Sequence, residues 1–353
     1  MAEGSAATAP ELVRAHVLRL APVPHGSVSA AELAGYGLSP GDVLDFSVNT
    51  NPLGPAPGVL RCVLDTDWSR YPGDDEAPLR RALAHHTGLD ANQVVLGNGS
   101  AELIWLLALA VLQAGDEVAV LGPTFGEYGR AAHVLGADLV EVASVDEVPA
   151  ARVVFVCNPN NPTGAYRGQD ELERLLRADA HRVIVLDEAY LAFVDGRWPS
   201  ERLLARYSNV VLLRSLTKEH ALPGLRLGYL LAAPQVAGAI EAVRPPWSVN
   251  AGALRAGLAA LEPEAQAHLA RAVDCVRVSR QRLTTGFERL GYRVWPSRAN
   301  FVLVEVGDGA AFRRGLLSRG FVVRDCASFG LPRCIRVACR LPDECDRLLA
   351  QLA

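Results

Sequence analysis

Short apolar runs alternate with helical patterns over most of the chain before residue 232. Seven runs are rich in β-branched residues and nearly all apolar, and they lie at residues 94–96, 118–121, 139–142, 153–157, 183–186, 210–213 and 227–231. Such runs are typical of strands that are buried on both faces, as in mostly parallel sheets. Because helical patterns such as 101–113 and 169–178 lie between them, we predict an α/β fold in which helices sandwich a mostly parallel, seven-stranded sheet.

A second unit is predicted beyond residues 244–247, because Pro245 and Pro246 end regular structure there. One long helical pattern covers 251–290. A strand, a helix, two strands and a helix are then expected at 301–306, 310–319, 321–323, 335–338 and 342–352. This order predicts a smaller α+β domain. The expected division is an N-terminal arm at 1–45 that is part of the small domain, a large domain at 46–250 and a small domain at 251–353.

Composition excludes several classes of protein. Half of the 353 residues are hydrophobic and 21% are charged, so a packed core is expected and extensive disorder is not. The formal net charge of -4 provides no basic surface for nucleic acid or an anionic membrane. Residues 1–10 lack the basic and apolar parts of a signal peptide, and no apolar run is long enough to cross a bilayer. We therefore expect a cytoplasmic protein that binds neither nucleic acid nor a membrane.

The cysteines do not form a recognisable framework. There are seven of them, an odd number, and no two are spaced as Cys-x-x-Cys. This pattern favours buried free thiols over a disulfide scaffold or a metal site, and no metal is predicted.

The most specific motif is Ser215-Leu216-Thr217-Lys218, which follows a buried strand and precedes Arg226. A lysine amine can form a Schiff base if burial or neighbouring charge lowers its pKa. Arg226 keeps its charge at any ordinary pH and can hold a phosphate permanently, and Ser215 adds a hydroxyl donor. The alternative, a solvated lysine in a surface turn, is disfavoured by these ordered neighbours.

Three other segments also follow strands, where ligands bind in open α/β sheets. Residues 97–102, Gly-Asn-Gly-Ser-Ala-Glu, open a helix whose free N–H groups can bind a phosphate; a tight turn with Ser100 as the helix cap is the alternative. Asp187 could pair with a protonated pyridine nitrogen, or it could be a helix cap or a metal ligand. Residues 157–164 contain two Asn-Pro steps that form a rigid turn, and an asparagine amide there could donate to a phenolate oxygen.

The order of these motifs resembles that of the fold type I enzymes that depend on pyridoxal 5′-phosphate, the aspartate aminotransferase superfamily. The resemblance covers about residues 20–350. It implies an aspartate aminotransferase-like fold, a pyridoxal 5′-phosphate cofactor, and a homodimer whose subunits share active sites. It also implies that the substrate is a small amino acid or a phosphorylated amine. A regulatory protein that binds the same cofactor is the alternative of another class, and the missing basic segment disfavours it.

The resemblance assigns roles to the matching positions. Lys218 is implied as the Schiff-base lysine, Asp187 as the partner of the pyridine nitrogen, and Tyr190 as a hydrogen-bond partner of the phenolic oxygen; these three are the predicted catalytic residues. The other implied cofactor-binding residues are Asn161 on the phenolic oxygen, Phe125 stacked on the ring, Ser100, Ala101, Ser215 and Arg226 on the phosphate, and Tyr71 on the phosphate of the neighbouring subunit. The implied substrate-binding residues are Arg336, Arg324 and Asn49.

Two branches of the superfamily fit best. Segments 45–54, 213–218, 245–250, 324–326 and 335–340 are closer to threonine-phosphate decarboxylase, which acts in cobalamin biosynthesis. We therefore expect a lyase of that type, with a transferase of the histidinol-phosphate aminotransferase type as the alternative.

Three residues depart from the pattern of these branches. Glu219 and His220 stand where the decarboxylase has aromatic or small residues. Glu305 stands where both branches tend to have an arginine near the substrate phosphate. A carboxylate at that place would repel a phosphate dianion, unless it turns outward or pairs with Arg324, and it could neutralise one of the two arginines Arg324 and Arg336.

Overall fold

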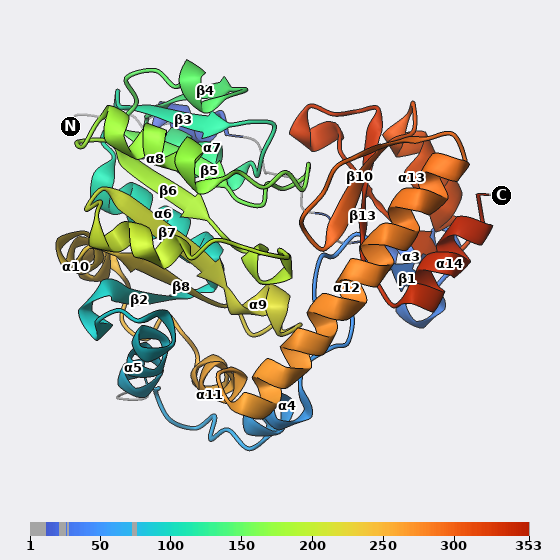
Figure 1. Cartoon of the computed structure of the whole chain (residues 1–353), viewed down its shortest axis with the longest axis horizontal. Helices are drawn as coiled ribbons and strands as arrows, with labels where there is room; N and C mark the ends of the chain where they lie inside the picture. Colours follow the sequence, from blue (N-terminus) through green and yellow to red (C-terminus); the bar gives the residue numbers. More distant parts are fainter. Residues whose placement is uncertain (1–11, 21–25, 27, 73–75, 353) are drawn as a thin grey trace, which may run out of the picture.

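The computed structural model describes residues 12–20, 26, 28–72 and 76–352. Residues 1–11, in which no signal peptide is expected, lie outside this part. The described chain forms a larger and a smaller body, and the long helix α12 (Pro263–Arg289) runs from one to the other (Figure 1). Within the described residues, no helix combines the length and the apolar character that crossing a bilayer requires.

The larger body contains the predicted seven-stranded sheet. All seven apolar runs form its strands, which are β2 (Val94–Asn98), β3 (Glu117–Leu121), β4 (Asp138–Val142), β5 (Val153–Cys157), β6 (Val183–Asp187), β7 (Val210–Ser215) and β8 (Leu227–Ala232). Their order in the sheet is β2-β8-β7-β6-β5-β3-β4. Only β8 runs antiparallel to its neighbours β2 and β7 among these paired strands, so the prediction of a mostly parallel sheet is confirmed.

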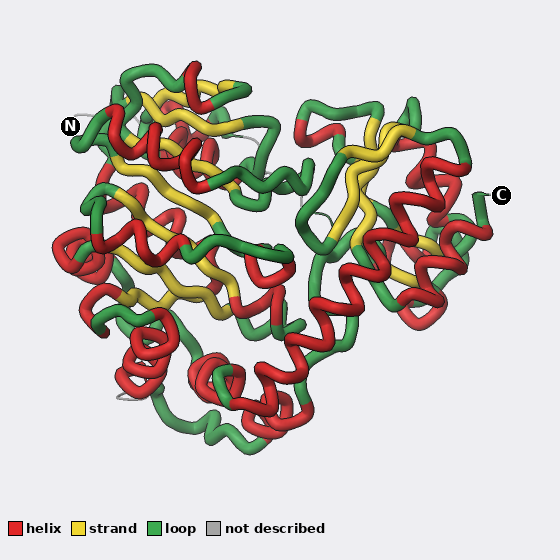
Figure 2. Tube along the Cα trace, viewed as in Figure 1, coloured by secondary structure: helices red, strands yellow, loops and turns green. Residues whose placement is uncertain are grey.

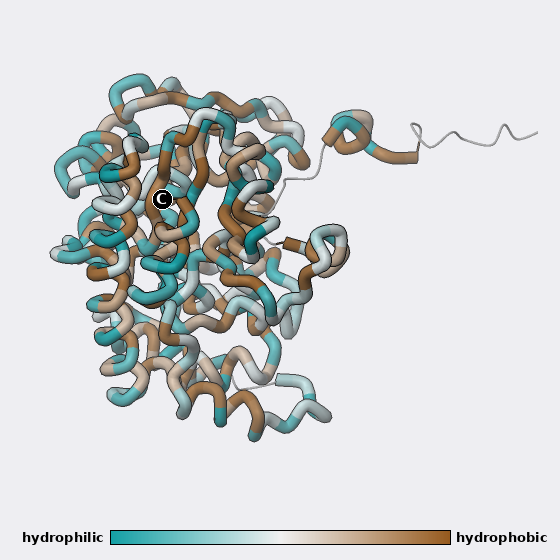
Figure 3. The backbone as a smooth tube through the Cα atoms, turned by 90° about the vertical axis from the view of Figure 1, so that its right-hand side faces the viewer, coloured by the Kyte–Doolittle hydropathy of each residue, from teal (hydrophilic) through white to brown (hydrophobic). Residues whose placement is uncertain are grey.

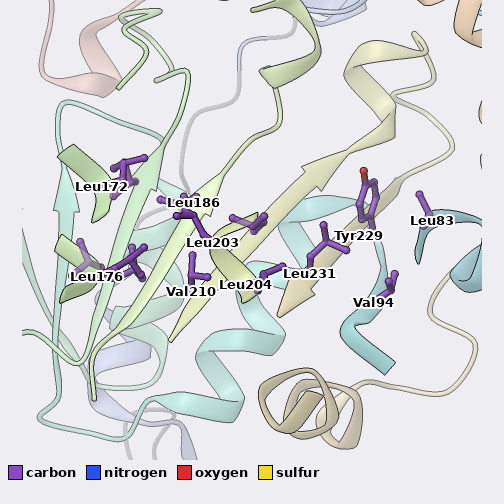
Figure 4. Close-up of a cluster of buried hydrophobic side chains, with 14 of the residues drawn as sticks. Leu83, Val94, Leu172, Leu176, Leu186, Leu203, Leu204, Val210, Tyr229 and Leu231 are labelled. Carbon is purple, nitrogen blue, oxygen red and sulfur yellow. The ribbon is translucent and has the colours of Figure 1, made fainter. Parts of the chain in front are cut away.

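Helices cover both faces of this sheet (Figure 2). On one face lie α5 (Glu76–Thr87), α8 (Gln169–Ala178) and α11 (Ala251–Ala260), and on the other lie α6 (Gly99–Val111), α7 (Glu127–Val134) and α10 (Pro234–Val243). Successive strand residues point to opposite faces: Val94 belongs to the first core cluster and Val95 to the second. Figure 4 shows part of the first cluster, in which Leu176 of α8 lies near Leu186 and Val210 of the sheet.

The smaller body is an α+β unit built on an antiparallel sheet of order β12-β13-β10-β9. Its strands and helices are β9 (Arg293–Trp295), β10 (Phe301–Glu305), β12 (Arg324–Asp325), β13 (Cys334–Ala338), α13 (Gly309–Leu317) and α14 (Pro342–Ala350). A second, two-stranded sheet pairs β1 (Leu44–Asp45) with β11 (Phe321–Val322) in parallel. The segment before residue 46 therefore adds to the smaller body, whereas the limits expected for the domains stay predictions.

The helical pattern at 251–290 forms two helices rather than the single one expected. The first, α11, ends at Ala260, and α12 begins at Pro263. Proline has no N–H with which to continue a helix, but it is favourable in the first turn of a new one. The break allows α11 to pack against α4 (Pro57–Leu64) and α5 in the larger body, while α12 continues to the smaller one.

The remaining helices are short: α2 (Ala15–Leu18), α3 (Ala30–Ala34) and α9 (Leu216–Glu219). The segment with α2 protrudes from the rest of the chain in the side view of Figure 3, and His16 Nε2 lies 3.0 Å from the carbonyl oxygen of Val134. All seven cysteines are free thiols and five of them are buried, as predicted from their spacing.

Candidate active site

A cavity of about 430 Å³ lies at the carboxyl ends of the parallel strands, and both bodies contribute to its wall. Twelve of the thirteen predicted site residues line it: Asn49, Ser100, Ala101, Phe125, Asn161, Asp187, Tyr190, Ser215, Lys218, Arg226, Arg324 and Arg336. The exception is Tyr71, which is exposed and stacks on Trp247 with ring centroids 4.5 Å apart. A residue that acts on the neighbouring subunit must lie outside the cavity of its own chain, so the role predicted for Tyr71 stays a prediction.

One end of the cavity is a cradle formed by the turn between β2 and α6. Gly99 has φ +79°, and a Cβ added to it would lie only 2.6 Å from Nη2 of Arg226. The backbone of the cradle therefore lies so close to Arg226 that only glycine, which has no Cβ, fits at position 99. Ser100 and Ala101 begin α6, where free N–H groups point outward. This end combines a fixed positive charge with unpaired donors, which is what a bound phosphate requires.

Two hydroxyl groups complete the cradle from the other side. The hydroxyl oxygens of Ser215 and Thr217 are 2.7 Å apart, and both residues are buried and line the cavity. Sequence reasoning selected Ser215 and missed Thr217, although Thr217 lies next to Lys218 in the same motif.

Asp187 lies at the carboxyl end of β6 and is buried. Its Oδ2 accepts a hydrogen bond of 2.7 Å from the Tyr128 hydroxyl, and its Oδ1 accepts one of 3.1 Å from the Ala189 N–H. Burial raises the pKa of Asp187, and these two donors act in the opposite direction. Tyr128 also packs edge-on against Phe125, with centroids 5.6 Å apart. Sequence reasoning missed Tyr128, because this residue follows the Phe125 motif within an ordinary helical pattern.

Lys218 lies in α9, directly after β7. Burial, with the nearby charges of Arg336 and Arg226, lowers the pKa of its amine to about 8, although Asp187 opposes the shift. Roughly a tenth of Nζ is thus neutral at pH 7, far more than for an ordinary lysine, and the neutral form is the one that a nucleophile requires. Asn51 fixes the backbone here, because its N–H donates to the Lys218 carbonyl and its side-chain amide donates to the Glu219 carbonyl, both at 2.9 Å.

Arg336 of β13 enters the cavity from the smaller body. Its guanidinium donates to the amide oxygen of Asn161 and to the Ser47 carbonyl, the latter at 2.8 Å. When the Asn49 side-chain amide is oriented so that its oxygen faces donors, this oxygen accepts hydrogen bonds from Nη1 and Nε of Arg336, both at 3.1 Å. The three predicted residues Asn49, Asn161 and Arg336 are therefore linked directly, and Ser47 is a further contact that sequence reasoning missed.

Tyr190 follows β6 and is buried with its ring edge-on to Phe301, at 5.1 Å between centroids. Burial raises the pKa of its hydroxyl, and the charge of Arg336 acts in the opposite direction. The hydroxyl therefore stays protonated at physiological pH and can act as a donor.

Arg324 lies opposite Arg336 on the adjacent strands β12 and β13. It donates to the Ser328 hydroxyl at 2.7 Å and lies over the Phe329 ring, 5.7 Å from its centroid. Burial and the charge of Arg336 lower the pKa of Arg324. Two guanidinium groups on neighbouring strands repel each other, and an anion bound between them would offset this repulsion. This wall of the cavity is therefore suited to an anionic group.

Glu305 turns away from the cavity. It is outside the cavity lining, and its carboxylate pairs with Arg333 at 3.1 Å and with Arg293 at 3.8 Å. Of the alternatives predicted for Glu305, the structure therefore shows the one in which the side chain turns outward. The alternative in which it neutralises Arg324 or Arg336 was wrong.

A model of the aminotransferase class I and II family matches residues 41–352. The chain belongs to this family. Enzymes of the family use pyridoxal 5′-phosphate, and the chain is an enzyme that depends on this cofactor. The predicted superfamily and the fold class are both confirmed.

Relatives and solved structures agree with this assignment. Histidinol-phosphate aminotransferase 1 of Thiobacillus denitrificans is 36% identical, over 98% of this chain and 93% of its own length. The structure of histidinol-phosphate aminotransferase from Sinorhizobium meliloti in complex with pyridoxal-5′-phosphate has a TM-score of 0.86 and 26% identity, and the match covers 98% of this chain and 97% of that chain. L-threonine-O-3-phosphate decarboxylase from Porphyromonas gingivalis has a TM-score of 0.79 at 24% identity, covering 88% and 98%, which shows the shared fold alone. The relatives favour the aminotransferase alternative over the decarboxylase that the sequence segments suggested.

The residues present in this family member fit the cofactor. The cradle at Gly99 admits no side chain and has a permanent cation beside it, as a phosphate needs. A buried carboxylate at the end of β6 and an amine of lowered pKa line the same cavity. Within the described ranges, no cluster of three or more His, Cys, Asp or Glu side chains is arranged to hold a metal ion.

Proposed function

We propose that the chain is an aminotransferase of the histidinol-phosphate type, which transfers an amino group between a phosphorylated amine and a dicarboxylic 2-oxo acid. The observation that carries this proposal is the similarity to histidinol-phosphate aminotransferases over nearly the whole chain. The pair Arg324 and Arg336, which lie opposite one another on β12 and β13 and line the same cavity as Lys218, supports an anionic substrate. The names of the relatives support amino transfer.

The residues that would hold the cofactor follow from the cavity wall. Ser100, Ala101, Ser215 and Arg226 would bind its phosphate, Phe125 would stack on its ring, and Asn161 and Tyr190 would donate to its phenolic oxygen. Asp187 would lie at the ring nitrogen and keep it protonated. When bound, pyridoxal phosphate supplies an electron sink for negative charge at the substrate carbon.

Lys218 has two tasks in this proposal. Its Nζ would hold the cofactor covalently, and as a free amine it would act as a general base and acid at the substrate carbon. Its lowered pKa, about 8, favours both tasks because Nζ can gain and lose a proton near neutral pH. Asn51 would keep Nζ in position by holding the backbone of α9.

The two arginines suit both substrates of an aminotransferase. A dicarboxylic amino acid has two anionic groups, and a phosphorylated amine has one dianionic group. Asn161, Asn49 and the Ser47 carbonyl hold Arg336 in a fixed orientation, so little side-chain entropy remains to be lost on binding.

Threonine-phosphate decarboxylation is the second candidate, because the same two arginines would also bind a phosphate and a carboxylate. The two reactions differ in which bond at the substrate carbon is aligned with the π-system of the ring. Cobalamin biosynthesis belongs to this second candidate only.

The deciding experiment incubates the purified enzyme and the cofactor with histidinol phosphate or with threonine phosphate, each with and without 2-oxoglutarate. Glutamate formation from histidinol phosphate that requires 2-oxoglutarate supports the proposal. Release of carbon dioxide from threonine phosphate without 2-oxoglutarate would favour the decarboxylase. An enzyme loaded with cofactor that performs neither reaction would overturn both candidates, and the Lys218→Ala variant is the matched blank.

We also infer a homodimer in which Tyr71 of each subunit reaches the phosphate site of the other. The exposed pair of Tyr71 and Trp247, with Trp68 close by against Gly252, forms an apolar surface that supports this arrangement. Sedimentation of an active monomer would refute it. The cytoplasm stays the predicted compartment.

A further inference from the structure

An ion pair joins the carboxyl ends of β6 and β7, which lie side by side in the large sheet (Figure 1). Glu188 directly follows β6, and Arg214 is the last residue but one of β7. Nε of Arg214 donates to Oε2 of Glu188 at 2.9 Å, and the two side chains are 11% and 1% exposed. Neither residue lines the reaction cavity, whereas their chain neighbours Asp187 and Ser215 both do. The pair therefore lies beside the active site without touching what binds there.

Arg214 has little freedom of its own. Its Nη2 donates to Oε2 of Glu201 at 2.8 Å and to the Ser200 hydroxyl at 3.1 Å. Both acceptors begin the short 3₁₀ helix η6 (Ser200–Ala205). Because the guanidinium is planar and engages three acceptors at once, its orientation is fixed by groups from two other segments of the chain. Glu188 is thus bound to a rigid donor.

The contacts of Glu188 fix the turn that orients Asp187. The Glu188 N–H donates to the carbonyl oxygen of Leu213 at 2.8 Å, so both the backbone and the side chain of Glu188 are attached to β7. The next residue, Ala189, donates its N–H to Oδ1 of Asp187 at 3.1 Å, as aspartate often accepts from the backbone two residues further on. A rotation of the backbone at Glu188 would move this donor relative to the carboxylate. Oδ2 is held separately by Tyr128.

Stability alone does not account for a buried ion pair at this place. Removing two charges from water costs free energy that their attraction often fails to offset, and apolar side chains of similar size can stabilise a fold as well or better. The strand residues 184–186, just before Asp187, are apolar and fully buried. An ionic contact that begins directly after Asp187 therefore points to a requirement for a fixed orientation at that residue.

We propose that Glu188 is a positioning residue for Asp187: held by Arg214, it keeps the Asp187 carboxylate aligned with the nitrogen of the cofactor ring. Alignment matters because a hydrogen bond weakens steeply when its donor and acceptor are out of line. The inference rests on the proposed place of Asp187 at the ring nitrogen, and it is independent of whether the reaction is amino transfer or decarboxylation.

The test compares two cofactors that differ only at the ring nitrogen. Cofactor-free enzyme is titrated with pyridoxal phosphate and with its 1-deaza analogue, in which a C–H group replaces the ring nitrogen and cannot form an ion pair with a carboxylate. The first variant is Glu188→Met, which leaves Arg214 with its contacts to Glu201 and Ser200. We expect its dissociation constant to rise about tenfold for pyridoxal phosphate and less than about twofold for the analogue. A general loss of structure would weaken both cofactors alike.

Three further variants separate positioning from such a loss. Arg214→Met removes the other half of the contact and should show the same selective effect. Glu188→Gln keeps a side-chain oxygen that can accept from Arg214, so it should retain most of the affinity. The matched control is Arg182→Met, which removes a buried arginine that donates to the carbonyl oxygens of Ala151 and Pro149 near the start of β6. This control should affect both cofactors alike.

Equal effects on both cofactors in Glu188→Met and Arg214→Met, or no effect on either cofactor, would overturn the proposal. Asp187→Asn distinguishes this failure from a failure of the proposed site, because it should weaken pyridoxal phosphate selectively if Asp187 lies at the ring nitrogen. Equal weakening of both cofactors in Asp187→Asn would remove the place proposed for Asp187, and this inference with it. Because the titration requires no turnover, a failure of the proposed amino transfer would leave its result unchanged.

Discussion

Tyr128 offers a sharp test of how the protein keeps Asp187 ionised. Removing its hydroxyl in Tyr128→Phe deletes the 2.7 Å hydrogen bond to Oδ2 and leaves the Ala189 N–H as the remaining donor to this carboxylate among the described residues. A hydrogen bond to a charged group contributes about 1.5–3 kcal/mol, and about 1.4 kcal/mol is a factor of ten in an equilibrium constant. Ionisation of Asp187 should therefore become roughly 10- to 100-fold less favourable in the variant.

The consequence for cofactor binding depends on pH. The bound cofactor needs an ionised Asp187. At any pH at which this carboxyl is protonated in the cofactor-free Tyr128→Phe variant, part of the binding free energy is therefore used to ionise it. We expect the dissociation constant of the cofactor to rise relative to the unmodified enzyme, and to rise further as the pH falls. The measurement is a fluorescence titration of the cofactor-free enzyme with the cofactor, repeated at several pH values between about 5.5 and 9, a range in which buried carboxyls often ionise.

Stability should change in the opposite direction with pH. Because the pKa of Asp187 in the folded chain is raised by burial, its contribution to stability is fully present at low pH and is lost as the pH rises through that pKa. Removing the Tyr128 hydroxyl should therefore destabilise the cofactor-free chain by about 1.5–3 kcal/mol at high pH and by about 1 kcal/mol where the carboxyl is neutral. The control is Tyr166→Phe, whose hydroxyl accepts only a 3.3 Å bond from the Trp198 N–H outside the cavity. Identical pH profiles for Tyr128→Phe and the unmodified enzyme would refute the reasoning.

Four further predictions concern the cavity itself and the subunit contact. Lys218→Ala should abolish covalent attachment, measured as cofactor retained after borohydride treatment and denaturation, together with turnover. Gly99→Ala should displace Arg226 and strain a residue at φ +79°, destabilising the chain by about 1–2 kcal/mol and weakening cofactor binding; unchanged binding by titration would contradict the cradle. Arg324→Ala should raise KM for a phosphorylated amine roughly 10- to 100-fold and hardly change it for the unphosphorylated analogue; equal effects on both would remove Arg324 from the substrate site. Tyr71→Phe should weaken cofactor binding, and mixing with cofactor-site variants should restore half of the sites if the subunits share them.

The sheet and most of the cavity were predictable from the sequence for a physical reason. Strands buried on both faces leave continuous apolar runs, and ligands collect where such strands end, so motifs that directly follow the runs are brought together. Ser100, Asn161, Asp187 and Lys218 all follow this rule. The same local reasoning did not predict the break between α11 and α12, because a proline in a helical pattern is compatible with either a kink or the start of a new helix.

Contacts between distant segments were outside the reach of local patterns. Tyr128 contacts Asp187 only because α7 packs on the sheet beside β3 and β4, and nothing in residues 127–134 indicates this. The orientation of Glu305 stayed open in the sequence, because a position matched by resemblance does not state which way a side chain at a strand end points. The role of Ser47 is a backbone carbonyl contact, which leaves no trace in residue type.

The contacts of residues 47–51 have a consequence for the order in which the protein is assembled. Ser47 and Arg336 are 289 residues apart, and Asn51 and Glu219 are 168 apart, yet these contacts orient the Arg336 side chain and the helix α9 that contains Lys218. Closing loops of this length is slow relative to forming the local β-α units of the large sheet. During synthesis, the phosphate cradle and Lys218 are therefore complete long before Arg336 leaves the ribosome. We expect nascent chains that end before β13 to bind the cofactor weakly and to gain full affinity only when the last strand enters its sheet.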